Sequence, residues 1–147
     1  MRPSKRCTDL IKHFEGVYLK PYICPAGYPT IGVGHLITHS EAAKYALGIT
    51  QQQCDNLLNA DLAKCCNYVL GMIHVPLTQG QFDALVSFVF NLGAGRLRSS
   101  TLRAKINRGD MDGAANEFGK WTLAGGRRLA GLVRRREAEK LLFVSKT

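Results

Sequence analysis

The residues best suited to chemistry lie within one short stretch near the N-terminus. Glu15 supplies a carboxyl, Cys24 a thiol and Thr30 a hydroxyl, with eight residues between the first two and five between the last two. His35 adds an imidazole a few residues further on. Turns rich in glycine and proline separate these side chains, and turns allow the side chains of one segment to converge on a cleft. The stretch is therefore a candidate active site.

Glu15 is the residue of this stretch that could act as a general acid. It falls at the C-terminal end of a predicted helix, where the negative end of the helix dipole disfavours an ionised carboxylate. A carboxyl that keeps its proton near neutral pH can protonate a leaving oxygen. The alternative is a solvated glutamate at a helix end, and position alone favours this alternative.

The flanking segments must fold so that these side chains can meet. The pattern predicts a short helix over 5–14, ended by Gly16, and then a small irregular antiparallel sheet with tight turns over 17–39. Further helices are expected at 40–47 capped by Ser40, at 50–70 capped by Thr50, after the cap Thr78, and at 99–107, 110–120 and 127–144. The predicted fold is α+β, with a small antiparallel sheet lobe and a larger helical lobe over about 40–147 that takes in the N-terminal helix. Both lobes are expected to form one domain over 1–147.

The composition is that of a basic globular protein. Hydrophobic residues make up 46% of the chain and charged residues 21%, and there are 20 Lys and Arg against 11 Asp and Glu. The excess is concentrated between 127 and 147, which holds seven Lys or Arg and two Glu. A charge of this sign attracts polyanions, among them nucleic acid, anionic lipid and anionic cell-wall polymers. Only the charge supports a nucleic-acid partner, and with no recognised binding motif none is expected.

The sequence also predicts where the chain resides. No apolar run approaches the roughly 20 residues that a membrane-spanning helix needs. The basic N-terminus is not followed by the apolar segment of a secretory signal. We therefore expect neither a transmembrane anchor nor a signal peptide, and a protein that stays in the cytoplasm until something else releases it.

The five cysteines are expected to be free thiols, because an odd number without a secretory signal argues against a disulfide framework. Three of them fall on the apolar stripe of the 50–70 helix and are expected in the core: Cys54, Cys65 and Cys66. His35 and His39 are four residues apart, but their segment is not predicted to be a helix, and no cysteine pair has zinc-finger spacing. Neither a metal nor a cofactor is expected.

Four separated motifs resemble the phage-type lysozymes, the glycoside hydrolase family of the T-even phage lysozyme. The first is the spacing of Glu15, Cys24 and Thr30, which is similar to the family's catalytic set of Glu, then Asp or Cys, then Thr. The others are TIGVGHL at 30–36, QFDALVSF at 81–88 with NLG at 91–93, and GLVRRRE at 131–137. Together they cover about 8 to 143, nearly the whole chain. The resemblance implies a lysozyme-like fold.

The resemblance also implies a reaction. This is hydrolysis, with inversion, of the β-1,4 bond between N-acetylmuramic acid and N-acetylglucosamine in bacterial peptidoglycan, leading to host cell lysis. Glu15 would protonate the leaving oxygen and Thr30 would hold the attacking water, which needs room opposite the acid. Cys24 stands where the best-known members carry Asp. A thiol has a reference pKa of about 8.5, so Cys24 is a base only if its pKa is lowered, and otherwise it only orients water.

Further residues carry over from the family by position. The substrate-binding residues implied in this way are Leu36, Phe90, Thr101 and Arg134. Arg134 is also the arginine of the 134–136 run that is expected to approach Glu15. His35 is expected to pair with Asp61 on the long helix. That pair would tie the sheet to the helix, which makes it structural rather than catalytic.

Two other functions stay open at this point. A lytic transglycosylase would cleave the same bond without water and leave a 1,6-anhydro sugar, although Thr30 at the water-holding position favours hydrolysis. A cationic membrane-active or wall-binding protein without catalysis is the second, because the basic amphipathic segment 127–144 suits an anionic surface such as lipopolysaccharide. The same pattern is typical of a closing helix whose apolar face lies in the core.

The expected partners follow from the resemblance. Peptidoglycan is the expected substrate, with anionic lipopolysaccharide or a membrane surface as a further partner of the basic C-terminal helix. The protein is expected to be a monomer. The family implies that it leaves the host cytoplasm through a holin lesion and reaches the periplasm and cell wall.

Overall fold

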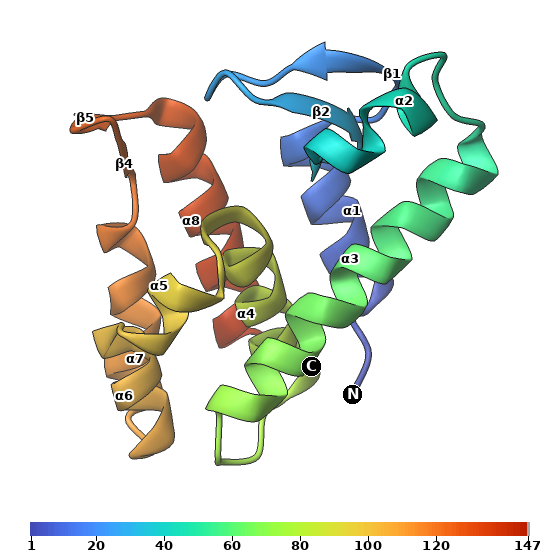
Figure 1. Ribbon diagram of the computed structural model, residues 1–147. Coiled ribbons are helices and arrows are strands. Elements are labelled where there is room, and N and C mark those ends of the chain that lie inside the picture. Colours follow the sequence, from blue (N-terminus) through green and yellow to red (C-terminus); the bar gives the residue numbers. More distant parts are fainter. Residues whose placement is uncertain (147) are drawn as a thin grey trace. The chain divides into compact units, whose positions relative to one another are not determined.

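The chain folds into two compact units that share two helices. The computed structural model describes residues 1–146, so the last residue of the predicted domain lies outside it. We call Ile11–Ala63 the sheet unit, and Met1–Leu10 together with the chain from Lys64 onward the helical unit. The helices α1 (Lys5–Glu15) and α3 (Gln51–Met72) each begin in one unit and end in the other (Figure 1).

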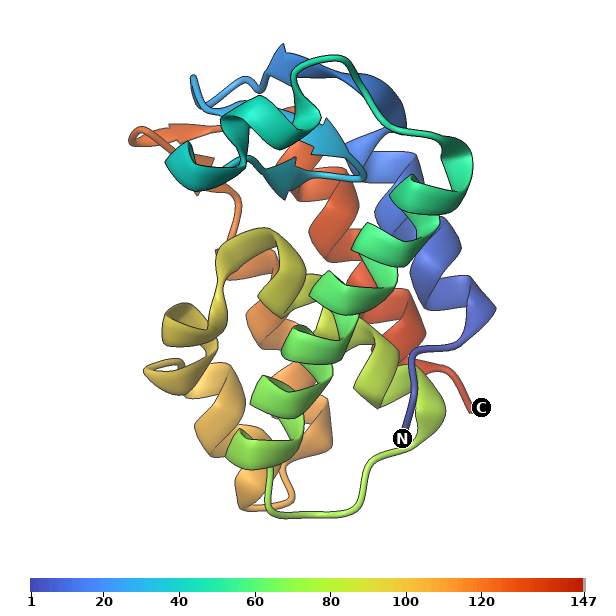
Figure 2. The same ribbon diagram turned by 45° about the vertical axis from the view of Figure 1, so that its right-hand side comes forward.

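The sheet unit is built around a small antiparallel sheet, as predicted. Its strands are β1 (Tyr18–Ile23), β2 (Pro29–Gly32) and β3 (His35–Leu36), in the spatial order β1-β2-β3. The short helices η1 (His39–Glu41) and α2 (Ala42–Tyr45) follow and lead to α3 (Figure 2). The predicted N-terminal helix is confirmed within one residue, because Gly16 adopts φ +80°, a backbone conformation that ends the helix.

Local hydrogen bonds explain where the helices of this unit begin. Thr50 caps α3, since its hydroxyl accepts a hydrogen bond from the backbone N–H of Gln53 at 3.1 Å. The cap expected at Ser40 is wrong by two residues. Thr38 instead forms a capping box with Glu41, whose carboxylate accepts from the Thr38 backbone N–H at 3.0 Å. The sequence Thr-x-x-Glu is the signal for this cap.

The apolar stripe of α3 is buried, as its spacing predicts. Its members are Cys54, Leu58, Leu62, Cys65, Cys66 and Val69. All five cysteines of the chain are free thiols. The prediction that the three cysteines of α3 are core residues is confirmed, and their burial in apolar surroundings makes them inert.

The helical unit packs several helices around α4 (Gln79–Leu92), whose residues from Phe82 to Val89 are all buried. Its other elements are α5 (Ala94–Arg98), α6 (Thr101–Asn107), α7 (Met111–Glu117), η2 (Phe118–Lys120), β4 (Leu123–Ala124), β5 (Arg127–Arg128) and α8 (Ala130–Val144). α4 lies against α8, and the Phe88 ring meets Phe118 and Trp121 edge-on at centroid distances of 5.9 and 5.5 Å. Such edge-to-face pairs add to the stabilisation from apolar burial.

Two predictions for this unit are wrong. The last helix begins at Ala130 rather than near 127, because Arg127 and Arg128 form a two-stranded hairpin with Leu123–Ala124. The pair Gly125-Gly126 supplies the turn of that hairpin, and such a pair is a sequence signal for one. The short helix α5 was not predicted at all, since five residues are too few for a helical period to show.

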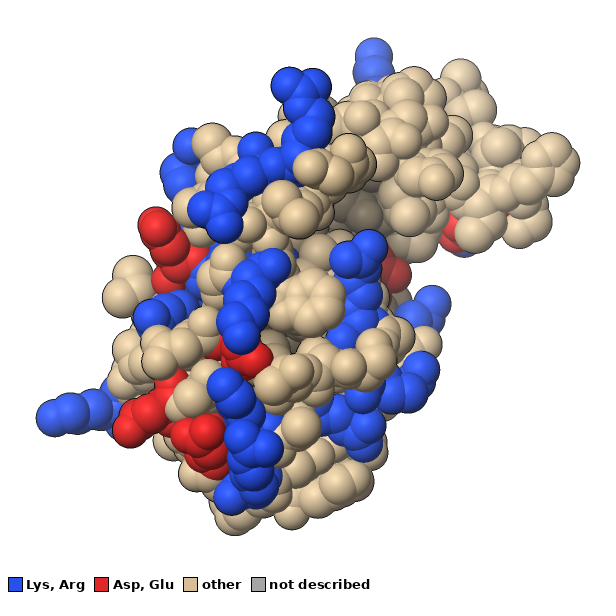
Figure 3. Space-filling view, turned by 90° about the vertical axis from the view of Figure 1, so that its left-hand side faces the viewer, with Lys and Arg blue, Asp and Glu red and all other residues tan. Residues whose placement is uncertain are grey.

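The described residues include no helix that is both long and apolar enough to span a membrane. The chain carries a net charge of +9. In the view of Figure 3, Lys and Arg side chains outnumber acidic ones over much of the surface, and one part of it is mostly uncharged.

Candidate active site

Glu15 is held against the turn between β2 and β3. It is the last residue of α1 and is half-buried. A methyl group built on Gly34, in that turn, would lie 2.9 Å from Oε1 of Glu15. Gly34 also has φ +65°, a conformation that side chains rarely adopt. The carboxyl therefore occupies space that only a glycine at position 34 leaves open.

Cys24 lies at the end of β1, in the hairpin that leads to β2. Its backbone N–H donates to the Tyr28 carbonyl at 2.9 Å, and Gly27 donates to the Cys24 carbonyl at 2.8 Å. The pKa of the Cys24 thiol is lowered chiefly because the Tyr28 backbone N–H bonds to the sulfur, and the Thr30 hydroxyl acts in the same direction against the effect of burial. Backbone amides that converge in a turn stabilise an anion. The Cys24 thiol therefore ionises more readily than an unperturbed cysteine.

Thr30 is at the centre of the small sheet and is 1% exposed. Its hydroxyl donates to the Tyr28 carbonyl at 2.9 Å. Because the hydroxyl has one hydrogen, it can serve the carbonyl or the Cys24 sulfur, but not both at once. The lone pairs of its oxygen remain able to accept a hydrogen bond from a third group.

The strand register places two more side chains beside Thr30. Tyr22 on β1 and Leu36 on β3 are its direct cross-strand partners, so all three side chains lie on the same face of the sheet. Leu36, one of the residues predicted to bind substrate, is 54% exposed there. Tyr22 was not identified from the sequence, because a bulge in β1 determines its register.

His35 is bonded to Asp61, at 2.7 Å between Nδ1 and Oδ2. Its Nε2 also lies 3.3 Å from both carboxylate oxygens of Glu41, a partner that the sequence did not suggest. Asp61 is the main cause that raises the pKa of His35, and Glu41 adds to it. The pKa of Glu41 is in turn lowered, first by the hydrogen bond from the Thr38 backbone. The imidazole thus links β3, η1 and α3.

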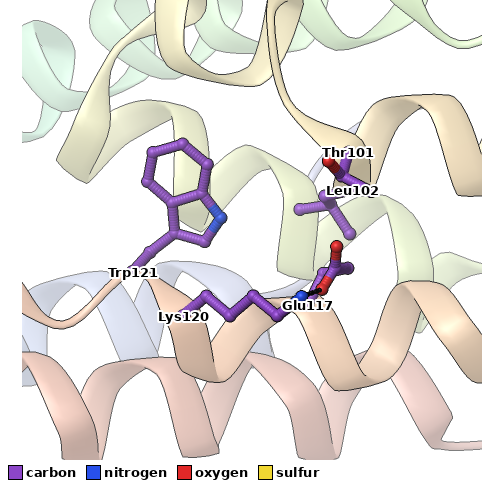
Figure 4. A pocket seen from close by; sticks show the side chains of 5 residues that line it. All are labelled: Thr101, Leu102, Glu117, Lys120 and Trp121. Carbon is purple, nitrogen blue, oxygen red and sulfur yellow. Dashed lines mark ion pairs between the residues drawn. The ribbon is translucent and has the colours of Figure 1, made fainter.

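The predicted substrate residues of the helical unit lie in different surroundings. Thr101, the first residue of α6, lines a hollow of about 190 Å³ together with Leu102, Glu117, Lys120 and Trp121 (Figure 4). Glu117 is buried and forms ion pairs with Lys120 at 2.5 Å and Lys105 at 3.7 Å, which lower its pKa. Phe90 is half-buried on α4. The hollow therefore offers an aromatic face, a hydroxyl and paired charges.

The arginine run 134–136 divides into one exposed and two buried residues. Arg134, the arginine predicted to approach Glu15, is exposed. Arg136 is 1% exposed and its Nε lies 2.8 Å from Oε1 of the fully buried Glu139. Arg135 approaches the other oxygen of Glu139 at 3.4 Å. Two of the arginines assigned to a basic outer face of the last helix are thus internal, which corrects that interpretation.

The fold and the site together define a class of protein. A small antiparallel sheet, with Glu15 of α1 held against one of its turns, combined with a mainly helical unit, is the lysozyme-like arrangement of a glycoside hydrolase. Residues 12–139 match the model of the Phage lysozyme family. The chain belongs to the phage lysozyme family, whose members hydrolyse the bacterial cell wall.

Known proteins support this assignment along the whole chain. The chain is 45% identical to the endolysin of Acyrthosiphon pisum secondary endosymbiont phage 1, over 99% of both chains. It is 41% identical to the endolysin of Bacillus phage B103, of which it spans only 55%. Among solved structures it resembles the muramidase domain of SpmX from Asticaccaulis excentricus, with a TM-score of 0.85 and 37% identity over 98% of both chains.

Proposed function

We propose that the protein hydrolyses the β-1,4 bond between N-acetylmuramic acid and N-acetylglucosamine with inversion, and that Glu15, Cys24 and Thr30 carry the reaction. The main support is that all three residues belong to the sheet unit. Glu15 lies against Gly34, just beyond one end of β2, and Thr30 in the same strand is near enough to Cys24 to help lower the pKa of its thiol. In the proposed reaction the Glu15 carboxyl is the proton donor and Cys24 is the proton acceptor.

Each residue then has a defined part in the reaction. Glu15 gives its proton to the glycosidic oxygen as the bond to the sugar carbon breaks. A water held by the Thr30 oxygen attacks that carbon from the opposite side and passes a proton to the Cys24 thiolate. The products are two sugar ends, a Glu15 carboxylate and a Cys24 thiol, and exchange with solvent restores both groups.

Substrate-binding roles are proposed for residues of each unit, taken separately. Leu36 supports this role because it is exposed directly beside Thr30. Thr101 supports it through its hollow, where the Trp121 ring offers a flat apolar surface to a sugar and Glu117 and Lys120 offer polar contacts. Phe90 and the exposed Arg134 complete the proposed set.

The decisive experiment measures how fast the protein clears a suspension of purified cell walls, seen as a fall in turbidity. Glu15→Gln keeps the size of the side chain but removes the acid proton, and clearing should fall by about 10²–10⁴-fold. Asp9→Asn is the matched control, because Asp9 lies on the same helix, is exposed and forms an ion pair with the exposed Lys5. The control should clear walls at the wild-type rate. A Glu15→Gln variant that clears walls normally would show that the protein acts without catalysis.

Product analysis separates hydrolysis from the transglycosylase alternative. Mass spectrometry should find reducing N-acetylmuramic acid ends rather than 1,6-anhydro ends. Inversion predicts that the first product formed is the α-anomer, which NMR during early turnover would detect. A 1,6-anhydro product would reject the role given to Thr30 and its water.

The remaining proposals concern partners and location. We propose that exposed arginines of the hairpin and α8, namely Arg127, Arg128 and Arg134, attract anionic lipopolysaccharide or membrane surfaces. The protein is proposed to act as a monomer, and to reach the wall from the host cytoplasm through a holin lesion. Sedimentation of the protein with anionic vesicles, with and without salt, tests the first proposal, because charge attraction weakens as salt rises.

A further inference from the structure

Strand β1 has an irregularity that brings two tyrosines together. Its pairing with β2 joins Tyr18 to Gly32 and Tyr22 to Thr30, so β1 advances four residues where β2 advances two. Side chains four residues apart in a regular strand are about 13 Å apart. The rings of Tyr18 and Tyr22 are instead 4.1 Å apart between centroids, with their planes tilted by 35°. β1 therefore bulges away from β2 between them and stacks the two rings.

The bulge is held by contacts of its own. The carbonyl of Leu19, within it, accepts a hydrogen bond from the backbone N–H of Ile49 at 2.8 Å. A methyl group at position 48 would lie 2.7 Å from the same oxygen, so glycine there permits the close approach. Pro21, which has no N–H to donate, also lies in the bulge, where the strand pairing is already interrupted. The bulge is thus stabilised by specific contacts, and bulges near active sites change the direction in which side chains point.

The stacked pair reaches from the acid to the water-holding threonine. At one end, the Tyr18 ring packs on Gly16, the residue after Glu15, so closely that a methyl group at 16 would lie 2.7 Å from ring carbon Cε2. At the other end, Tyr22 is the direct cross-strand neighbour of Thr30. Each contact lies within the sheet unit.

The pKa of Tyr22 agrees with a position between Glu15 and Thr30. Burial is the main cause that raises its pKa, and negative charge on Tyr18, Glu15 or Cys24 would raise it further. The phenol therefore stays neutral at the pH of catalysis. It lies close enough to both proposed catalytic groups to sense their charges.

We propose that Tyr22, stacked on Tyr18 across the β1 bulge, is a positioning residue that sets the separation between Glu15 and the Cys24–Thr30 pair. This inference rests on the proposed function. An inverting enzyme must keep its acid and its water-activating group far enough apart to admit one water. A displacement of about 1 Å costs about 100-fold in rate. The aromatic ring performs this task by packing, and its hydroxyl is not required.

The test compares Tyr22→Ala, Tyr22→Phe and the matched control Ile23→Ala, which alters the neighbouring β1 residue, 65% exposed. Initial rates of wall solubilisation give kcat and KM, measured well below the Tm of each variant. In Tyr22→Ala, kcat should fall about 10–100-fold while KM changes by less than about twofold. The pH profile of kcat should also move, because water then reaches Glu15 and Cys24. Tyr22→Phe should restore the wild-type kcat and profile, and Ile23→Ala should leave both unchanged.

Other outcomes would overturn the inference. If Tyr22→Ala lowers only the Tm and keeps kcat and its pH profile, Tyr22 serves stability alone. If Tyr22→Phe is as impaired as Tyr22→Ala, the hydroxyl and not the ring is the working group. Glu15→Gln is measured alongside, so that an active Glu15→Gln variant rejects the proposed function itself. An inactive Glu15→Gln with an unaffected Tyr22→Ala rejects only the role of Tyr22.

Discussion

Removal of the Glu139 carboxylate should strongly destabilise the helical unit. Glu139 is fully buried on α8 and accepts a hydrogen bond from the Ser87 hydroxyl at 2.5 Å. It also contacts Arg136 at 2.8 Å and Arg135 at 3.4 Å, and both guanidinium groups are buried. Burial raises the pKa of Glu139, and the two arginines oppose that shift. Glu139→Ala would leave two buried cations without their common anion.

The size of the effect follows from this geometry. Removing one partner of a buried ion pair costs about 3–5 kcal/mol in the free energy of unfolding, because the other charge stays buried and uncompensated. For a chain of this size, each kcal/mol lowers the Tm by about 2–4 °C. Glu139→Ala should therefore lower the Tm by about 6–20 °C, as the product of these two ranges.

Circular dichroism during heating, and urea unfolding at constant temperature, would measure the loss. Glu137→Ala is the matched control, since Glu137 is exposed on the same helix and such surface changes stay within about 0.5 kcal/mol. A Glu139→Ala protein as stable as Glu137→Ala would refute the reasoning. It would mean that the arginines find other partners or water, and that the buried network contributes little.

Three further predictions concern the sheet unit. The hydrogen bond to Asp61 raises the pKa of His35 in the folded protein. The stability that this contact contributes is therefore fully present below the pKa of the unfolded state, about 6.5, and is lost as the pH rises through the pKa of the folded state. The Tm difference between wild type and His35→Gln should accordingly shrink between pH 5 and pH 9, and a constant difference would contradict it. If the thiolate is the base, the wall-clearing activity of the wild type should rise with pH as the Cys24 thiol ionises, and Cys24→Ser should not show this rise. Cys24→Asp should be active at lower pH. Identical pH profiles of activity for wild type and Cys24→Ser would exclude the thiolate as the base. Gly34→Ala should cost about 1–2 kcal/mol of stability through its positive φ and should displace Glu15, so that clearing falls more than stability explains; normal clearing would show that the contact is unimportant.

Much of the fold could be predicted because its signals are local. Helix starts at Thr50 and Thr78 depend on a residue three positions away, within one helical turn. The burial of Cys54, Cys65 and Cys66 follows from helical spacing alone. The spacing of the candidate catalytic residues is likewise a property of one short stretch.

The features that escaped prediction depend on partners far along the chain or on the path of a strand. Which arginines of 134–136 are buried depends on Glu139 and on Ser87, 52 residues before Glu139. The place of Tyr22 beside Thr30 depends on a bulge that no alternation of residues reveals.

The sequence by itself determined the helix caps at Thr50 and Thr78 and the thiols of the core, because each is encoded within a turn or two of backbone. The class of fold and the candidate acid came from four separated motifs that together resemble a known family. The tertiary structure alone decided that the amides of one hairpin lower the pKa of Cys24, that Gly34 leaves space for the Glu15 carboxyl, and that two arginines are internal. Those properties are set by distances between atoms of separate elements, and such distances exist only once the chain has folded.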